Sequence, residues 1–138
     1  LVDLAAPGTN TTSIGWGWTN FTIKENSEVL LETENWIMNH TKCTEIYNVT
    51  GRVVTEDMIC ETREEGKGSC KGDSGSPFLI KGQDASSDIQ IGITSWGVGC
   101  ARPIFPGVKA RVSAEIDFVQ TVQECDIPAG IMFDFWDF

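Results

Sequence analysis

The sequence predicts an all-β fold, an antiparallel barrel or sandwich, because turn residues punctuate short apolar segments throughout the chain. Several of these segments alternate apolar and polar residues with the period of two that is typical of half-buried strands. The predicted strands cover residues 14–17, 28–31, 76–80, 89–93 and 107–112. With 138 residues, of which 41% are hydrophobic, the chain has enough apolar side chains to fold as one compact domain.

Two stretches have helical character. The spacing of apolar residues weakly predicts a short helix over residues 35–47. It also predicts a helix over residues 114–123 that closes the domain. Ser113 is a favourable N-cap for the second helix, whose apolar residues recur at helical spacing at Ile116, Val119 and Val122. Beyond it, residues 126–138 mix aspartates with large apolar side chains, and we expect this tail to dock on a surface that the sequence does not identify.

Charge and hydropathy exclude two classes of partner. Ten Lys and Arg against twenty Asp and Glu leave a net charge of -10 without a basic stripe, so nucleic acid is a poor partner. The apolar runs fall far short of the ~20 residues that cross a bilayer, and residues 1–5 lack the features of a signal peptide. We therefore expect a soluble chain without membrane contact, whose first residues look like the middle of a longer protein.

Cysteines and glycosylation sequons point to the secretory route. The five cysteines include no CxxC pair and no Cys/His cluster with zinc spacing, which favours disulfides over metal and an oxidising compartment. Four sequons, at Asn10, Asn20, Asn39 and Asn48, exceed the roughly one expected by chance, although any single one could be an unused surface triplet. Together these signals predict a secreted, extracellular glycoprotein.

The chemistry lies in residues 70–77, Cys-Lys-Gly-Asp-Ser-Gly-Ser-Pro. A serine hydroxyl is a weak nucleophile, so it needs a tight turn whose backbone N–H groups face the developing oxyanion, and glycines permit that turn. The run resembles the Gly-Asp-Ser-Gly-Gly-Pro signature of chymotrypsin-like serine proteases, with Ser76 at the second of the paired glycines. Taken alone, an ordinary Gly/Ser/Pro loop between strands would be the alternative.

The flanking sequence resembles the same family in order, at residues 14–17, 57–60, 93–97, 99–100 and 106–112. The resemblance covers about residues 1–124 and identifies the chain with the C-terminal half of the catalytic domain. It implies a Greek-key antiparallel β-barrel, the second of two, with a closing C-terminal helix over residues 1–125 and the acidic-aromatic tail at 126–138. It also implies peptide-bond hydrolysis through an acyl-enzyme.

The resemblance assigns roles around the nucleophile. Ser74 would attack the scissile carbonyl, and the backbone N–H groups of Gly72 and Ser74 would form the oxyanion hole. Asp73 would be structural, because in the family this carboxylate pairs with the amino terminus released when the zymogen is cut. An edge strand would bind the substrate backbone through Ser95, Trp96 and Gly97.

The substrate pocket is assigned in the same way, to Gly68, Ser69, Lys71, Gly97 and Gly107. Gly68 stands where trypsin-like members carry an aspartate, so we expect a large apolar side chain (Phe, Tyr, Leu or Met) at the cleaved bond rather than Lys or Arg. Lys109 replaces a tyrosine usual behind the pocket. Without a nearby acid it could favour an acidic substrate side chain, or it could turn outward and contribute nothing.

The resemblance also implies the disulfides Cys43–Cys60 and Cys70–Cys100. A third family bridge would join the positions of Thr11 and Ile80, which have lost both cysteines together. Cys125 is left over, and it could bridge to another polypeptide, tie down the tail or remain free.

The chain departs from the family in lacking two catalytic groups. His40, the sole histidine, lies inside a sequon and lacks the Ala-Ala-His-Cys setting of the family's base, so we expect a surface residue. None of Asp3, Asp57 and Asp73 matches the catalytic aspartate's motif. Either an N-terminal barrel absent from this sequence supplies both groups, or the chain is a noncatalytic homologue that binds partners. We favour the first alternative because the sequence retains Ser74 together with Gly72, Asp73 and the 95–97 edge segment. We expect protein or peptide substrates, and neither a cofactor nor a metal.

Overall fold

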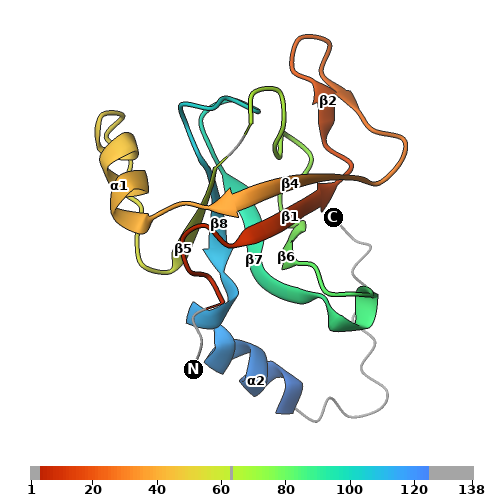
Figure 1. Cartoon of the computed structure of the whole chain (residues 1–138), viewed down its shortest axis with the longest axis vertical. Coiled ribbons are helices and arrows are strands. Elements are labelled where there is room, and N and C mark those ends of the chain that lie inside the picture. Colours follow the sequence, from red (N-terminus) through yellow and green to blue (C-terminus); the bar gives the residue numbers. More distant parts are fainter. Residues whose placement is uncertain (1–3, 63, 125–138) are drawn as a thin grey trace, which may run out of the picture.

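The computed structural model describes residues 4–62 and 64–124, and it is a closed antiparallel β-barrel (Figure 1). Going round the barrel, the strands follow the order β1-β4-β5-β8-β7-β6, and β6 closes on β1. Although β5 and β6 are consecutive barrel strands, β8 and β7 lie between them, which is a Greek-key connection. The six strands are β1 (Asn10–Gly15), β4 (Leu31–Ile37), β5 (Met58–Thr62), β6 (Pro77–Ile80), β7 (Ile89–Trp96) and β8 (Gly107–Arg111).

Smaller elements decorate the two ends of the barrel. The hairpin β2 (Trp18–Asn20) and β3 (Glu25–Asn26) projects at one end, and α2 (Ile116–Glu124) lies at the other (Figure 1). Helix α1 (His40–Asn48) connects β4 to β5, and the Asn39 side chain caps it by accepting the Lys42 N–H at 3.1 Å. Two 3₁₀ turns complete the described chain, Ala85–Ser87 and Val112–Ala114.

The pairing of the barrel strands is uneven. β1 and β4 form an extended hairpin with six residue pairs, from Asn10 opposite Trp36 to Gly15 opposite Leu31. On either side, this hairpin joins its neighbours through two pairs only, between β4 and β5 and between β1 and β6. Because Thr12 pairs with Leu79, the next step of the register brings Thr11 opposite Ile80, the positions of the lost third bridge.

The core consists of two apolar clusters. One lies between α1 and the barrel, and the other fills the barrel around Phe78, whose side chain is fully buried. Burying a side chain of this size stabilises the fold by about 1.5–3 kcal/mol. The buried members are Cys43, Tyr47, Val54, Cys60 and Val108 in the first cluster and Ile37, Ile59, Phe78 and Ile91 in the second.

The structure confirms the predicted barrel and three of its strands and moves the boundaries of others. Residues 76–80, 89–93 and 107–112 correspond to β6, β7 and β8, whereas β5 has no counterpart among the predicted strands. The prediction at 28–31 is wrong because the strand begins only at Leu31, and residues 14–17 overlap just the end of β1. Exposed Glu32 and Glu34 alternate with inward residues along β4, so the strand lacks an apolar signature.

The helix boundaries are also corrected. Residues 35–37 belong to β4, and α1 starts at His40 because Asn39 supplies the cap. Ser113 is not an N-cap. It lies within the 3₁₀ turn Val112–Ala114, where the Glu115 N–H donates to Val112 O at 3.0 Å before α2 begins at Ile116. Cys125, Asp3 and the tail 126–138 lie outside the described residues.

Candidate active site

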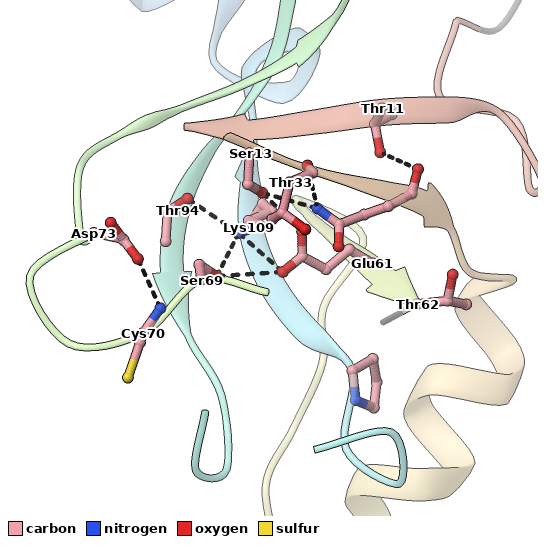
Figure 2. Close-up of polar contacts among 12 residues, drawn as sticks. Thr11, Ser13, Thr33, Glu61, Thr62, Ser69, Cys70, Asp73, Thr94 and Lys109 are labelled. Atoms are coloured by element: carbon pink, nitrogen blue, oxygen red, sulfur yellow. Dashed lines mark hydrogen bonds and ion pairs between the residues drawn. The ribbon is translucent and has the colours of Figure 1, made fainter. Parts of the chain in front are cut away.

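The loop between β5 and β6 that carries Ser74 is held from within by a buried carboxylate. Asp73 accepts the backbone N–H of Gly17 at 2.7 Å and that of Cys70 at 2.8 Å (the second bond is drawn in Figure 2). The Asp73 N–H in turn donates to Cys70 O at 3.1 Å, and Cys70 is bonded to Cys100. These contacts fix the loop to the β2 side of the molecule and to the loop after β7.

Ser74 sits at the exposed tip of this loop. Its neighbours tie the loop to β7, since the Gly75 N–H donates to Thr94 O at 2.9 Å and the Thr94 N–H to Ser76 O at 2.8 Å. Gly72 has φ +95°, a left-handed conformation that a side chain would oppose. In the part of the chain that the structure describes, the N–H groups of Gly72 and Ser74 donate to no protein acceptor. An exposed hydroxyl therefore lies on a turn with two unused amide donors.

A pocket of about 200 Å³ opens beside Ser74, a size that suits one side chain rather than a whole ligand. It gathers most of the residues expected from the sequence: Ser69, Lys71, Ser74, Ser95, Trp96 and Gly97, together with Phe21, Cys70, Thr94, Gly99 and Cys100. Gly68 instead lines a neighbouring cavity of about 690 Å³ that Asp73 also borders. Gly107 and Lys109 are buried and line neither of these two pockets.

Sequence reasoning missed Phe21 as a pocket residue, and it also left Thr94 and Gly99 unassigned. Phe21 follows β2 and contacts Trp18 edge to face, with the ring centroids 6.2 Å apart. The Lys71 ammonium lies 5.4 Å from the Trp18 ring centroid, so this hairpin borders the pocket beside Ser74 from the β2 side. No sequence signal pointed to Phe21, because it reaches the pocket only through the fold of the hairpin.

Lys109 is fully buried beneath the pocket in a polar network (Figure 2). Its ammonium lies 3.2 Å from Glu61 Oε1, and it donates to the hydroxyls of Ser69 at 2.9 Å and Thr94 at 3.0 Å. Both sequence-based alternatives for Lys109 are therefore wrong, because the side chain does not turn outward and an acid does face it.

Glu61 is itself surrounded by hydroxyl groups. Its Oε1 accepts from Ser69 at 3.2 Å and its Oε2 from Ser13 at 2.9 Å, and its side chain is also fully buried. Buried charges persist in proteins when they are paired and hydrogen-bonded, as these two are. The pair leaves no uncompensated charge below the pocket.

His40 lies outside the pocket beside Ser74. It lies on α1, and its Nε2 is 3.3 Å from Glu56 Oε1. Asp57 accepts a hydrogen bond from the Thr55 hydroxyl and also lies outside that pocket. Among the described residues, the Ser74 hydroxyl has no side-chain hydrogen-bond partner, and no cluster of His, Cys, Asp or Glu could hold a metal ion.

Comparison with known proteins shows the family to which this chain belongs. The family model described as Trypsin matches residues 2–119. The chain belongs to the trypsin family of serine proteases. It is 40% identical over 118 residues to Trypsin eta of Drosophila melanogaster, and the match covers 83% of this chain and 40% of that protein. Mannan-binding lectin serine protease 1 of Rattus norvegicus is 36% identical over 107 residues, which cover 77% of this chain and 15% of the relative.

A solved trypsin-family structure gives the same result. The structure titled neuropsin, a serine protease expressed in the limbic system of mouse brain, superposes with a TM-score of 0.75 at 28% identity, and the match covers 86% of this chain. The chain spans half of that protein and 40% of the length of Trypsin eta. The comparisons therefore confirm the resemblance and the fold, with this chain in the C-terminal portion of a trypsin-family domain.

Both disulfides implied by the trypsin family are present. Cys43 and Cys60 are bonded with their Cα atoms 6.3 Å apart, and this bridge ties α1 to β5. Cys70 and Cys100 are bonded with a Cα separation of 4.9 Å, joining the loop that carries Ser74 to the loop after β7. Both cysteines of the second bridge line the pocket beside Ser74.

The four sequon asparagines, Asn10, Asn20, Asn39 and Asn48, are not buried. Two of them use the side-chain oxygen locally: Asn39 caps α1, and Asn20 accepts the Thr22 N–H at 2.8 Å. A glycan is attached through the amide nitrogen, so both contacts are compatible with modification. No helix within the described ranges is long and apolar enough to span a bilayer.

Proposed function

We propose that this chain is the C-terminal half of a serine endopeptidase domain, with Ser74 as the nucleophile. The observation that carries the proposal is the exposed Ser74 beside a side-chain-sized pocket. The backbone N–H groups of Gly72 and Ser74 have no acceptor among the described residues. A histidine and an aspartate from an N-terminal barrel would complete the catalytic group. Large apolar residues exposed on α2 are consistent with such a partner surface: Ile116, Phe118 and Val122.

The reaction follows from this geometry. The Ser74 Oγ attacks the peptide carbonyl while the histidine of the N-terminal barrel takes its proton, and the carbonyl oxygen becomes an oxyanion facing the two amides. The C–N bond breaks, the amine leaves with that proton, and water then releases the acyl group from Ser74. Each amide donor contributes about 3 kcal/mol to transition-state stabilisation.

Asp73 has a structural role in this proposal. Its carboxylate is buried, holds two loop amides and borders the cavity of about 690 Å³. An amino terminus released by zymogen cleavage would enter that cavity and pair with Asp73, so that cleavage stabilises the loop carrying Gly72 and Ser74.

The pocket favours a large uncharged side chain at the cleaved bond. Glycine at position 68 offers no carboxylate to Lys or Arg, and the Lys109 charge is paired with Glu61 rather than free for an acidic substrate. Trp96 and Gly97 line the pocket, and the 95–97 segment would bind the substrate backbone. Cleavage of a peptide panel mainly after Lys or Arg would contradict this specificity.

The test of catalysis uses the full-length protein with its N-terminal barrel. A fluorophosphonate probe should label Ser74, and the Ser74→Ala variant should remain unlabelled. Absence of labelling in a protein that contains the upstream histidine would overturn the proposal and favour a noncatalytic binding homologue. The isolated chain should hydrolyse no peptide, because it lacks the general base.

The cysteines and sequons support a secreted glycoprotein. Structural disulfides such as these two are typical of an oxidising compartment, and all four acceptor asparagines are accessible. Enzymatic deglycosylation of the native protein should lower its mass. An unchanged mass would contradict the glycan part of this proposal.

A further inference from the structure

The hydrogen-bonding capacity of Ser69 is almost completely committed. Its hydroxyl has one proton and two acceptor lone pairs. The proton is donated to Glu61 Oε1 at 3.2 Å, and one lone pair accepts from the Lys109 ammonium at 2.9 Å. What remains at Ser69, in the wall of the pocket beside Ser74, is a single acceptor.

The contacts below Ser69 keep this polarity from reversing. The Lys109 ammonium can only donate and the Glu61 carboxylate can only accept, so rotation of the Ser69 hydroxyl would leave one buried charge with an unmatched neighbour. Both charged side chains are fully buried. Ser13 and Thr94 hold the far sides of the pair, through Glu61 Oε2 at 2.9 Å and Lys109 Nζ at 3.0 Å.

We propose that the buried Glu61–Lys109 pair is a positioning device that turns Ser69 into a fixed acceptor in the pocket. Ser69 then selects, at the cleaved bond, a large side chain that ends in a neutral hydrogen-bond donor, and tyrosine is preferred over phenylalanine. A lysine side chain also donates, but it would bring a charge into a pocket that offers no carboxylate in return. This inference rests on the proposed peptidase function and narrows its substrate class.

The test compares two peptides that differ only in Tyr or Phe at the cleaved bond, using the full-length protease. One neutral hydrogen bond corresponds to a preference of about 3- to 10-fold, so kcat/KM should be higher for Tyr by that factor. In the Ser69→Ala variant the Tyr/Phe ratio should fall to about one. Equal cleavage of both peptides by the wild type, or an unchanged ratio in Ser69→Ala, would overturn the inference.

A second variant tests the buried pair itself. Glu61→Leu combined with Lys109→Met replaces both charges by apolar groups, a change that proteins often tolerate without loss of stability. Ser69 is then free to rotate and donate, and the Tyr/Phe ratio should again fall toward one. If the folded double variant keeps the wild-type Tyr/Phe ratio, the positioning role of the buried pair is wrong. If the double variant does not fold, the wild-type and Ser69→Ala measurements still test the inference.

The matched control is Ser86→Ala, the same substitution at an exposed serine that lines neither of the two pockets. It leaves the contacts of Ser69, Glu61 and Lys109 in place, so the Tyr/Phe ratio should remain at its wild-type value. Fluorophosphonate labelling of Ser74 is measured in each preparation. A labelled enzyme with equal rates for Tyr and Phe contradicts only this inference, whereas an unlabelled wild type contradicts the proposed function itself.

Discussion

Gly15 at the end of β1 should be indispensable for the conformation of the nucleophile loop. A Cβ atom at Gly15 would lie 1.9 Å from Asp73 Oδ1 and 2.8 Å from Asp73 Cγ, so Gly15→Ala forces the carboxylate to move. That carboxylate accepts the N–H groups of Gly17 and Cys70 at 2.7 and 2.8 Å. Hydrogen bonds to charged groups contribute about 1.5–3 kcal/mol each, so losing both removes about 3–6 kcal/mol from the stability of this loop.

The consequence is measurable as a loss of turnover in the complete protease. A displaced Asp73 releases Gly72, and loss of one oxyanion donor lowers kcat about 10²–10³-fold. Gly51→Ala is the control, because Gly51 has φ +72° and a Cβ atom there would meet nothing within 4 Å, so this substitution introduces backbone strain without touching Asp73. Wild-type kcat in Gly15→Ala, measured on a peptide that the parent enzyme cleaves, would refute the reasoning.

Three further predictions concern stability and titration, measured in the complete protease. Tyr47→Phe should lower the free energy of unfolding by about 1–3 kcal/mol in urea denaturation, because the buried carbonyl of Pro106 loses its donor; an unchanged value would contradict this. Replacing Cys43 and Cys60 together by serine opens a link across 17 residues and should cost about 3 kcal/mol, and a smaller loss than that from Tyr47→Phe would argue against it. The pKa of the Asp84 carboxyl should lie below its ordinary value, because the Ser86 and Ser87 side chains and then their amides donate to it. Its contribution to stability is therefore present above the unfolded-state pKa and lost as pH falls through the folded-state pKa; an NMR titration midpoint at or above the ordinary value would be incompatible with these contacts.

Sequence patterns predicted those parts of the barrel in which hydrophobicity follows the strand period. β7 and β8 have apolar alternation and were placed well, but β4 presents Glu32 and Glu34 to solvent and buries Asn35, so its inward face is not marked by apolar residues. Burial of a polar side chain depends on partners distant in sequence, here the Ser13 hydroxyl, which accepts from Asn35 Nδ2 at 3.3 Å. Local propensity contains no information about such pairs.

The same distinction applies to the site. The motif around Ser74 predicted a tight turn, and the structure places Ser74 exposed on a loop beside a pocket lined by most of the residues expected there, because a short motif fixes a local turn. Glu61 could not be assigned from sequence, since a glutamate in a strand is usually solvated and only Lys109, on a strand paired with β5, explains its burial. Phe21 likewise depends on where the hairpin folds.

The β1–β4 hairpin, which we call the flap, is joined to the neighbouring barrel strands β6 and β5 along two short edges, which we call the seams. With two residue pairs along each edge, against six within the hairpin, we expect a gap to open at these edges more readily than within the hairpin. Water entering through that gap would reach the paired charges of Glu61 and Lys109, because Ser13 and Asn35 belong to the flap. Amide hydrogens facing the two seams should therefore exchange with deuterium sooner than those shared by β7 and β8.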